Sequence, residues 1–113
     1  MKKIEAIIRP NRLEPVKDAL DDLGFSGGIT VWEVKGHGKQ RGITEQWRGR
    51  EYRVEYLSKV YLLLVVADDK SDAVVDAILD NASSGEIGDG KVFISTVDDA
   101  VRVRTRERGE EVL

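Results

Sequence analysis

The chain has 113 residues, which fits one domain spanning residues 1–113, and a chain of this size buries roughly two thirds of its unfolded surface. Cysteine is absent and His37 is the only histidine, which excludes disulfides and thiol chemistry and argues against a zinc site or a Ser/His/Asp triad. With 18 Lys and Arg against 21 Asp and Glu, the net charge of -3 does not favour nucleic acid.

The apolar stretches are too short for a targeting segment or a membrane span. The opening MKKIEAII is interrupted at once by Arg9 and Pro10, so it does not fit a secretory signal. The longest apolar run, residues 60–66, falls far below the roughly 18 residues of a membrane-spanning helix. We therefore expect a cytoplasmic protein without direct membrane insertion.

Hydrophobic periodicity predicts four strands and two helices. The strands are expected at residues 2–8, 29–34, 60–66 and 91–97. The first helix is expected to carry Leu13, Val16, Leu20 and Leu23 on one side and to end at Gly24. The second helix should begin near a side-chain cap from Ser71 or Asp69, with its apolar side formed by Val74, Val75, Ile78, Leu79 and Ala82.

This order of elements, with two similar strand and helix units, predicts an α+β ferredoxin-like βαββαβ sandwich. In that fold both helices cover one face of a four-stranded antiparallel sheet. Residues 60–66 are apolar on both faces, yet the chain has no further element to cover the second face. Another copy of the chain is the simplest cover, so we infer a homo-oligomer.

A long polar segment, residues 36–58, separates the second and third strands and lacks a helical or strand period over most of its length. Loops longer than about 12 to 15 residues are usually functional or disordered. Its base offers glycines, Lys39 and Gln40 to an anion, and its tip carries aromatic and arginine side chains of the kind that anchor protein interfaces. We interpret this segment as a binding arm.

Two further clusters could bind phosphate. The glycine-rich loop 83–90, followed by Lys91, can expose backbone N–H groups in a concave nest, although an ordinary turn is the alternative. It is not a Walker motif, because the GxxxxGK[ST] spacing is missing and no helix follows. The tail, residues 100–113, is expected to be extended to residue 105 and frayed beyond it.

Arginines at alternate positions of this tail, namely Arg102, Arg104, Arg106 and Arg108, would share one face of an extended segment. Their guanidinium groups match phosphate oxygens. Surface pairing with Glu107, Glu110 or Glu111 is the alternative.

These clusters, in this order, resemble the PII family of nitrogen-regulatory signal proteins over the whole chain. The matching segments are MKKIEAIIRP, TVWEVKGHGKQRG, RGREY, and SGEIGDGKVFI with VRVRT. The resemblance implies a ferredoxin-like homotrimer that is not an enzyme and that binds ATP or ADP in three clefts between subunits. This chain departs from the family pattern at Trp47, Arg50, Leu63 and Arg106, the last of which replaces a usual glycine.

The resemblance also implies roles for individual residues. The phosphates of ATP or ADP would lie against Gly88, Asp89, Gly90 and Lys91, with Arg102 and Arg104 in the same cleft. Other residues lining the nucleotide would be Thr30, Gly38, Lys39, Val65 and Val103. Gln40 matches the glutamine that helps to ligate Mg²⁺ beside 2-oxoglutarate, and Lys59 matches the lysine that pairs with a carboxylate of 2-oxoglutarate.

Partners follow from the same resemblance. Family members regulate ammonium transporters, and glutamine synthetase or another enzyme of nitrogen metabolism is a further possible target. Arg48 matches an arginine that enters the transporter pore mouth, and Trp47 and Tyr52 lie beside it in the arm. Tyr52 also matches a tyrosine that some members have uridylylated or adenylylated.

Two alternatives from other functional classes remain at this stage. RNA-recognition domains share the same order of strands and helices, but they stack bases on aromatic residues of the two central strands, where this chain offers only Tyr61. A small nucleotide hydrolase is the other alternative, although no base is evident near the glycine-rich loop except Asp89, Glu86 or a glutamate of the arm.

Overall fold

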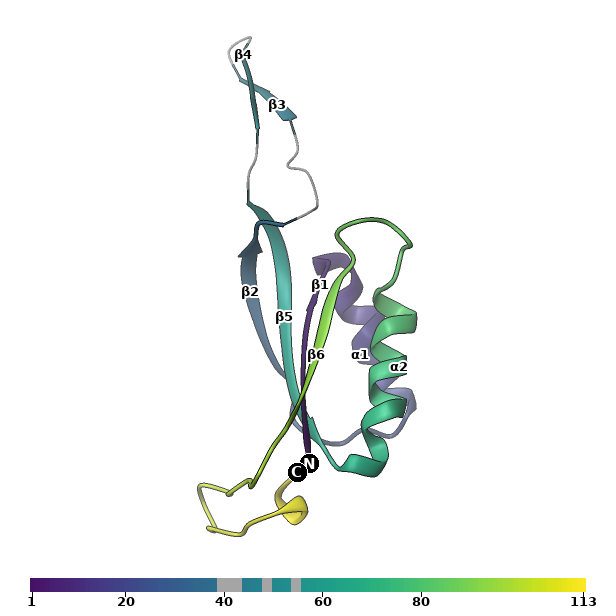
Figure 1. The fold of residues 1–113 in the computed structure, drawn as a ribbon, viewed down its shortest axis with the longest axis vertical. Coiled ribbons are helices and arrows are strands. Elements are labelled where there is room, and N and C mark those ends of the chain that lie inside the picture. Colours follow the sequence, from purple (N-terminus) through teal and green to yellow (C-terminus); the bar gives the residue numbers. More distant parts are fainter. Residues whose placement is uncertain (39–43, 48–49, 54–55) are drawn as a thin grey trace.

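The computed structural model describes residues 1–38, 44–47, 50–53 and 56–113. Its main sheet has the strand order β2-β5-β1-β6, and every neighbouring pair is antiparallel. The strands are β1 (Lys2–Ile8), β2 (Thr30–Gly36), β5 (Leu57–Val66) and β6 (Gly90–Thr96). Helices α1 (Leu13–Asp22) and α2 (Ser71–Ala82) lie together on one face of this sheet (Figure 1), which confirms the predicted ferredoxin-like sandwich.

The core lies between the helices and the sheet. Side chains alternate between the two faces of a strand, so every second residue of β1 and β5 points to the helices. The strands bury Ile4, Ala6, Ile8, Val60, Leu62, Leu64 and Val66, and the helices bury Val16, Leu20, Val74, Ile78 and Ala82. This single core fixes the strand register, because a slip of one residue would expose the whole set.

The ends of the helices agree only in part with the sequence prediction. Gly24 follows α1 with a φ of 73° and acts as the predicted stop. The side-chain cap predicted for α2 is wrong, because a 3-10 turn (Asp68–Lys70) runs directly into the helix. Leu79 is about half exposed, so its predicted place on the buried side is also wrong. Among the described residues, neither helix is long and apolar enough to cross a bilayer.

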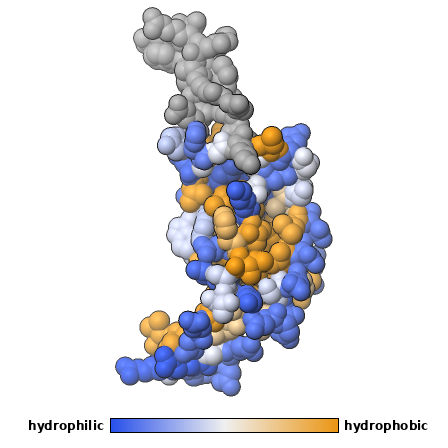
Figure 2. Space-filling model, in the orientation of Figure 1, coloured by the Kyte–Doolittle hydropathy of each residue, from blue (hydrophilic) through white to orange (hydrophobic). Residues whose placement is uncertain are grey.

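The face of the sheet opposite the helices has no helix over it in the described part of the chain (Figure 1). Trp32 and Phe93 lie on this face with 45% and 51% of their surface exposed. Tyr61 packs edge-on against Trp32, with 5.1 Å between the ring centroids. A second apolar strip lies between β6 and α2 (Figure 2), where Ile94 and Leu79 are exposed. The predicted half-covered sheet is therefore confirmed.

The arm contains more regular structure than its sequence suggests. Strands β3 (Thr44–Trp47) and β4 (Arg50–Arg53) pair as a separate antiparallel ribbon, with Thr44 opposite Arg53 and Trp47 opposite Arg50. The ribbon extends the molecule away from the main sheet, beyond the ends of β2 and β5 (Figure 1). The expectation of an irregular arm is wrong for these two segments.

The C-terminal tail is neither extended nor frayed, contrary to prediction. It folds back on itself, since the N–H of Arg102 donates to Glu107 O at 2.9 Å and the N–H of Gly109 donates to Ala100 O at 3.0 Å. A short 3-10 helix, η3 (Glu110–Val112), follows. Arg106 and Gly109 have φ values of 63° and 82°, and such left-handed residues allow the chain to reverse.

Candidate functional site

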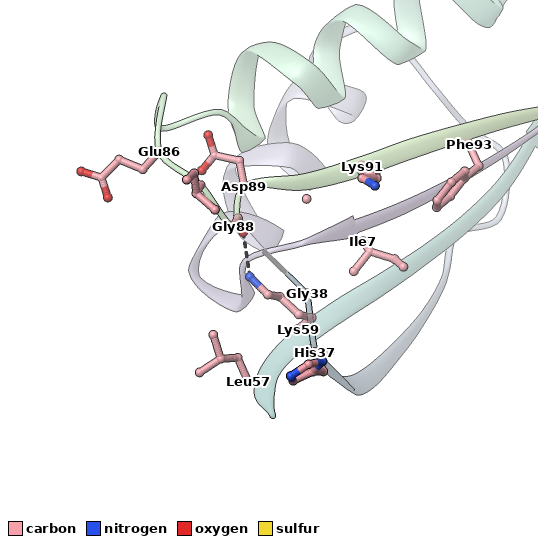
Figure 3. Close-up of a pocket in the computed structure, with 13 residues that line it drawn as sticks. Ile7, His37, Gly38, Leu57, Lys59, Glu86, Gly88, Asp89, Lys91 and Phe93 are labelled. Atoms are coloured by element: carbon pink, nitrogen blue, oxygen red, sulfur yellow. Dashed lines mark hydrogen bonds between the residues drawn. The ribbon is translucent and has the colours of Figure 1, made fainter. Parts of the chain in front are cut away.

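A pocket of about 500 Å³ lies at one end of the sheet, where β1 and β2 end and β5 and β6 begin. The pocket lies between the base of the arm and the glycine-rich loop that precedes β6 (Figure 3). Its lining comprises Ile7, Gly36, His37, Gly38, Leu57, Lys59, Glu86, Ile87, Gly88, Asp89, Gly90, Lys91 and Phe93. The structure thus brings together Gly38, Lys59 and the four residues predicted to bind phosphate, 88–91.

The shape of the glycine-rich loop depends on its glycines. Gly85, Gly88 and Gly90 have φ values of 84°, 103° and 107°, which residues with a Cβ rarely adopt. Gly90 also lies against β1, and a Cβ there would come within 1.7 Å of the carbonyl oxygen of Ile7. The loop can approach β1 this closely only because residue 90 has no side chain.

The Asp89 side chain stabilises the glycine-rich loop by accepting hydrogen bonds from residues at its start. Its carboxylate accepts hydrogen bonds from the N–H groups of Ser84 and Gly85, at 2.7 and 2.9 Å, and from the Ser84 hydroxyl. Nε of Arg9 lies 3.2 Å from the same carboxylate, and a second nitrogen of Arg9 donates to Ile87 O at 2.9 Å. These donors, with Ser84 first, hold the pKa of Asp89 well below its ordinary value.

Replacing Asp89 by Asn should destabilise the protein at neutral pH, because the donors around the loop lose a charged acceptor. A carboxylate whose native pKa is lowered stabilises the fold above the unfolded pKa of 3.8 and loses that effect as the pH falls through the native value. The difference in unfolding free energy between the two proteins should thus be constant from pH 7 to about pH 5 and shrink below about pH 4. Urea unfolding across this range measures it.

Asp76→Asn is the matched control, because Asp76 is exposed in the middle of α2. We expect it to leave the unfolding free energy unchanged within about 0.5 kcal/mol at every pH. A difference between Asp89→Asn and the unsubstituted protein that does not shrink in acid would contradict the assigned role of the carboxylate.

Two lysines bring positive charge into the pocket, whose lining also contains the carboxylates of Glu86 and Asp89. Nζ of Lys59 reaches from β5 to the carbonyl oxygen of Gly88 at 2.7 Å (Figure 3), and Lys91 enters from the start of β6. Partial burial, and then the nearby Arg9, lower the pKa of Lys59, while Asp89 opposes this shift. An anionic ligand in this pocket would relieve the repulsion between the cations, so the site favours anions.

The other predicted nucleotide residues that the structure describes lie at the opposite end of the sheet. Thr30 begins β2, and Val65 lies at the far end of β5 from Lys59, six residues or about 20 Å along the strand. Arg102, Val103 and Arg104 belong to the tail, which is drawn below the sheet in Figure 1, whereas the glycine-rich loop that lines the pocket is drawn near the top of the sheet. Within one chain, the structure therefore divides the predicted nucleotide residues into two groups.

A second pocket, of about 460 Å³, lies at this opposite end and is lined by Ser26, Gly27, Val65, Glu110 and Leu113 among others. Nearby in the chain, Arg102 is paired with Glu107, at 3.1 Å, and Arg108 with Asp99, at 3.0 Å. The alternative that tail arginines pair with carboxylates is therefore confirmed for Arg102. The shared arginine face is wrong, because the tail turns at residues 103–105.

Some predicted residues cannot be placed. Lys39, Gln40 and Arg48 lie outside the described residues, and Trp47 and Tyr52 are described only through the backbone pairing of β3 with β4.

Sequence reasoning also misses two residues of the site. From the sequence, Arg9 marks only the end of a strand, and Ser84 is only part of a loop. The role of Arg9 follows from the register that places Ile8 opposite Gly90, and the role of Ser84 follows from the turn that brings it back to Asp89, five residues further along the chain.

One family model and several known proteins match this chain over most or all of its length. The family model described as "Nitrogen regulatory protein P-II" matches residues 1–107. A protein of that name from Rhizobium meliloti is 50% identical over 113 residues, which is the full length of both chains. "Nitrogen regulatory protein P-II 2" from Methanothermobacter thermautotrophicus is 52% identical over all of this chain and 97% of its own length. A P-II protein from Microchaete diplosiphon is 53% identical over the full length of both chains. The chain therefore belongs to the P-II family of nitrogen regulatory proteins, which are signalling proteins and not enzymes.

Proposed function

We propose that this chain is a sensor of ATP, ADP and 2-oxoglutarate that reports nitrogen, carbon and energy status through its arm. The observation that carries the proposal is the pocket, with its two lysines, between the glycine-rich loop and the base of the arm. The N–H groups of residues 88–91, with Lys91, would bind the nucleotide phosphates. Gly38 and Lys39, at the root of the arm, would respond to whichever ligand is present.

Mg²⁺ would join the nucleotide to 2-oxoglutarate. Among the described residues, no group of three acidic or histidine side chains could hold a metal ion by itself. Mg²⁺ usually binds through substrate phosphates together with only one or two protein groups, which agrees with a role for the Gln40 amide beside the phosphates of ATP. Lys59 would then pair with a carboxylate of 2-oxoglutarate, next to its present acceptor at Gly88 O.

A homotrimer would complete the nucleotide site. One chain keeps Lys91 and the glycine-rich loop at one end and Thr30, Val65, Arg102, Val103 and Arg104 at the other. A head-to-tail ring brings the pocket of one subunit against the tail of the next, and a closed ring repeats that contact at every interface. The exposure of Trp32 and Phe93 in the single chain supports such an assembly, because a neighbouring subunit would cover them.

The arm would carry the signal to partner proteins in the cytoplasm. An ammonium transporter is the proposed target, with Arg48 at the tip and Trp47 and Tyr52 beside it, and glutamine synthetase or another nitrogen-metabolism enzyme is a second class of target. Because the arm starts at the pocket wall formed by Gly36, His37 and Gly38, a ligand there can bias its conformation. Modification of Tyr52 would alter the same surface.

Calorimetric titration of 2-oxoglutarate in the presence and absence of Mg-ATP tests the mechanism directly. We expect 2-oxoglutarate to bind with measurable affinity only when Mg-ATP is present, because the metal ion and the phosphates complete its site. Binding that is the same with and without nucleotide would rule out the proposed coupling. Salt-sensitive binding of single-stranded RNA would instead support the RNA-recognition alternative.

Replacing Lys59 by Gln should weaken the binding of 2-oxoglutarate much more than the binding of ADP. We expect the affinity for 2-oxoglutarate in saturating Mg-ATP to fall about 10-fold to 100-fold, because a charge-assisted contact is lost. The affinity for ADP should change less than about threefold, since the phosphates are assigned mainly to the glycine-rich loop and Lys91. Calorimetry of each ligand gives both values.

Lys35→Gln is the charge-matched control. Lys35 is exposed on β2 and pairs in register with Ser58, outside the lining of the pocket that contains Lys59. The Lys35→Gln variant removes one positive charge from the same region, and its affinities for 2-oxoglutarate and ADP should stay within about twofold of those of the unsubstituted chain. Equal losses of 2-oxoglutarate binding in the two variants would show that overall charge, and not Lys59 itself, sets the affinity.

A further inference from the structure

Arg102 holds the folded tail together through several contacts. Its Nη1 lies 3.1 Å from Oε1 of Glu107, and its Nη2 donates to the carbonyl oxygen of Glu111 at 3.2 Å. Its backbone N–H donates to Glu107 O at 2.9 Å, and its carbonyl oxygen accepts from the N–H of Arg106 at 2.8 Å. One guanidinium therefore connects the start of the tail to its last turn.

The partner of Arg102 in this fold has the chemistry of a ligand phosphate. A carboxylate and a phosphate both present a pair of oxygens to the guanidinium fork, so they compete for the same N–H groups. The pair is open to exchange, because the side chains of Arg102 and Glu107 are 36% and 47% exposed. An exposed ion pair of this kind changes an equilibrium constant by up to about fivefold.

The contact between Arg102 and Glu111 O joins Arg102 to the turn that forms one wall of the second pocket. That pocket is lined by Glu110 and Leu113 from the last turn and by Val65 from β5. Within the turn, the N–H of Val112 donates to Gly109 O at 3.2 Å and the N–H of Leu113 donates to Glu110 O at 3.1 Å. If the Arg102 side chain changes its partners, this wall loses a side-chain link to the start of the tail and keeps only backbone bonds, such as the one from the N–H of Gly109 to Ala100 O.

The folded tail also contains a strained residue. Arg106 is the only residue other than glycine with a positive φ in the described part of the chain, at 63°. An L-residue with a Cβ is disfavoured in this conformation relative to glycine. The strain raises the free energy of the closed tail and so favours its opening when Arg102 finds another anion.

We propose that Glu107 is an internal competitor for the anionic ligand of Arg102, and that a nucleotide phosphate displaces it and frees residues 110–113 from the second pocket. This proposal rests on the proposed function, because it takes Arg102 as a phosphate-binding residue. Glu107 then sets the nucleotide affinity without touching the nucleotide. The end of the tail becomes a second part of the molecule, besides the arm, whose conformation depends on occupancy.

Titration of ADP into three proteins tests the competition. Relative to the unsubstituted chain, Glu107→Gln should lower the dissociation constant about threefold to fivefold, because Arg102 loses its charged partner. Glu111→Gln removes the same charge from the same tail while keeping its backbone carbonyl contact with Arg102, so its dissociation constant should change less than about twofold. Thermal melting and size measurements confirm that all three proteins are folded and assembled alike.

The outcomes separate this proposal from the one on which it rests. If the unsubstituted chain does not bind ADP, the proposed function fails and the competition fails with it. If ADP binds but Glu107→Gln and Glu111→Gln have the same affinity, only the competition is wrong. Hydrogen exchange of the unsubstituted chain adds a direct readout, since the amides of Val112 and Leu113 should exchange faster in saturating ADP. Unchanged or slower exchange there would overturn the release of the tail.

Arg106 provides a second test that leaves Glu107 in place. Arg106→Gly and Arg106→Ala both remove the charge, but only glycine adopts a φ of 63° without strain. The Arg106→Gly variant should therefore have a more stable closed tail and bind ADP about twofold to fivefold more weakly than the Arg106→Ala variant. Equal affinities, or tighter binding by the glycine variant, would contradict a closed tail that competes with the ligand.

Discussion

Replacing Gly90 by Ala should lower the free energy of unfolding by about 3 kcal/mol or more. The new Cβ would lie 1.7 Å from Ile7 O and 2.8 Å from the Ile7 carbonyl carbon, and both atoms belong to the backbone of a central strand. The φ of 107° adds a further cost for any residue with a Cβ. Because β1 cannot move without disturbing the core, we expect the start of β6 to separate from it. Urea unfolding at a fixed chain concentration measures the loss.

Gly85→Ala is the matched control for this prediction. Gly85 belongs to the same loop and has a similar φ of 84°, but a Cβ at this position would meet no atom within 4 Å. The control therefore carries the cost of the backbone conformation without the steric clash, and we expect a loss of about 1 kcal/mol. If the two variants were equally stable, close packing against β1 would not be the reason for glycine at residue 90.

Mixing two defective variants should restore nucleotide binding. Lys91→Gln damages the pocket half of the proposed site and Arg102→Gln damages the tail half, so each protein alone should bind ADP about 10-fold to 100-fold more weakly. In a head-to-tail ring assembled from equal amounts of both, about a quarter of the sites pair an intact pocket with an intact tail. Calorimetry after subunit exchange should find high-affinity sites in that proportion.

A mixture of Lys91→Gln with Lys91→Ala is the control, because neither chain provides an intact pocket half. We expect no high-affinity sites in that mixture. If the mixture of Lys91→Gln with Arg102→Gln also stayed inactive, both halves would have to come from the same chain, and the proposed ring would be wrong.

The sequence predicted those features that depend on local periodicity. The alternation in the strands and the helical spacing of residues such as Val16 and Leu20 gave the correct order of elements and most of the core. The apolar run at residues 60–66 places apolar side chains on both faces of β5, and the second copy of the chain expected to cover the outer face stays a prediction. Gly88 and Gly90 have φ values that favour glycine, while the expected approach of their backbone to a ligand stays a prediction.

The failures have physical causes that local patterns do not contain. Alternate arginines indicate a shared face only if the backbone is extended, and the positive φ of Arg106 and Gly109 reverses the tail instead. The contact of Arg9 with Asp89 joins residues 80 positions apart and depends on the pairing of β1 with β6. The side-chain cap of α2 failed because a 3-10 turn already leads into the helix.

Strand β5 has a further implication for how such a ring would respond to its ligands. Lys59 lies near one end of it and Val65 near the other, so in the proposed assembly each copy of β5 borders two different clefts. Filling one cleft would alter the strand that also borders the next, and successive binding steps would then have unequal constants. A graded response to metabolite concentration, with partly filled rings as distinct signalling states, follows from that shared strand.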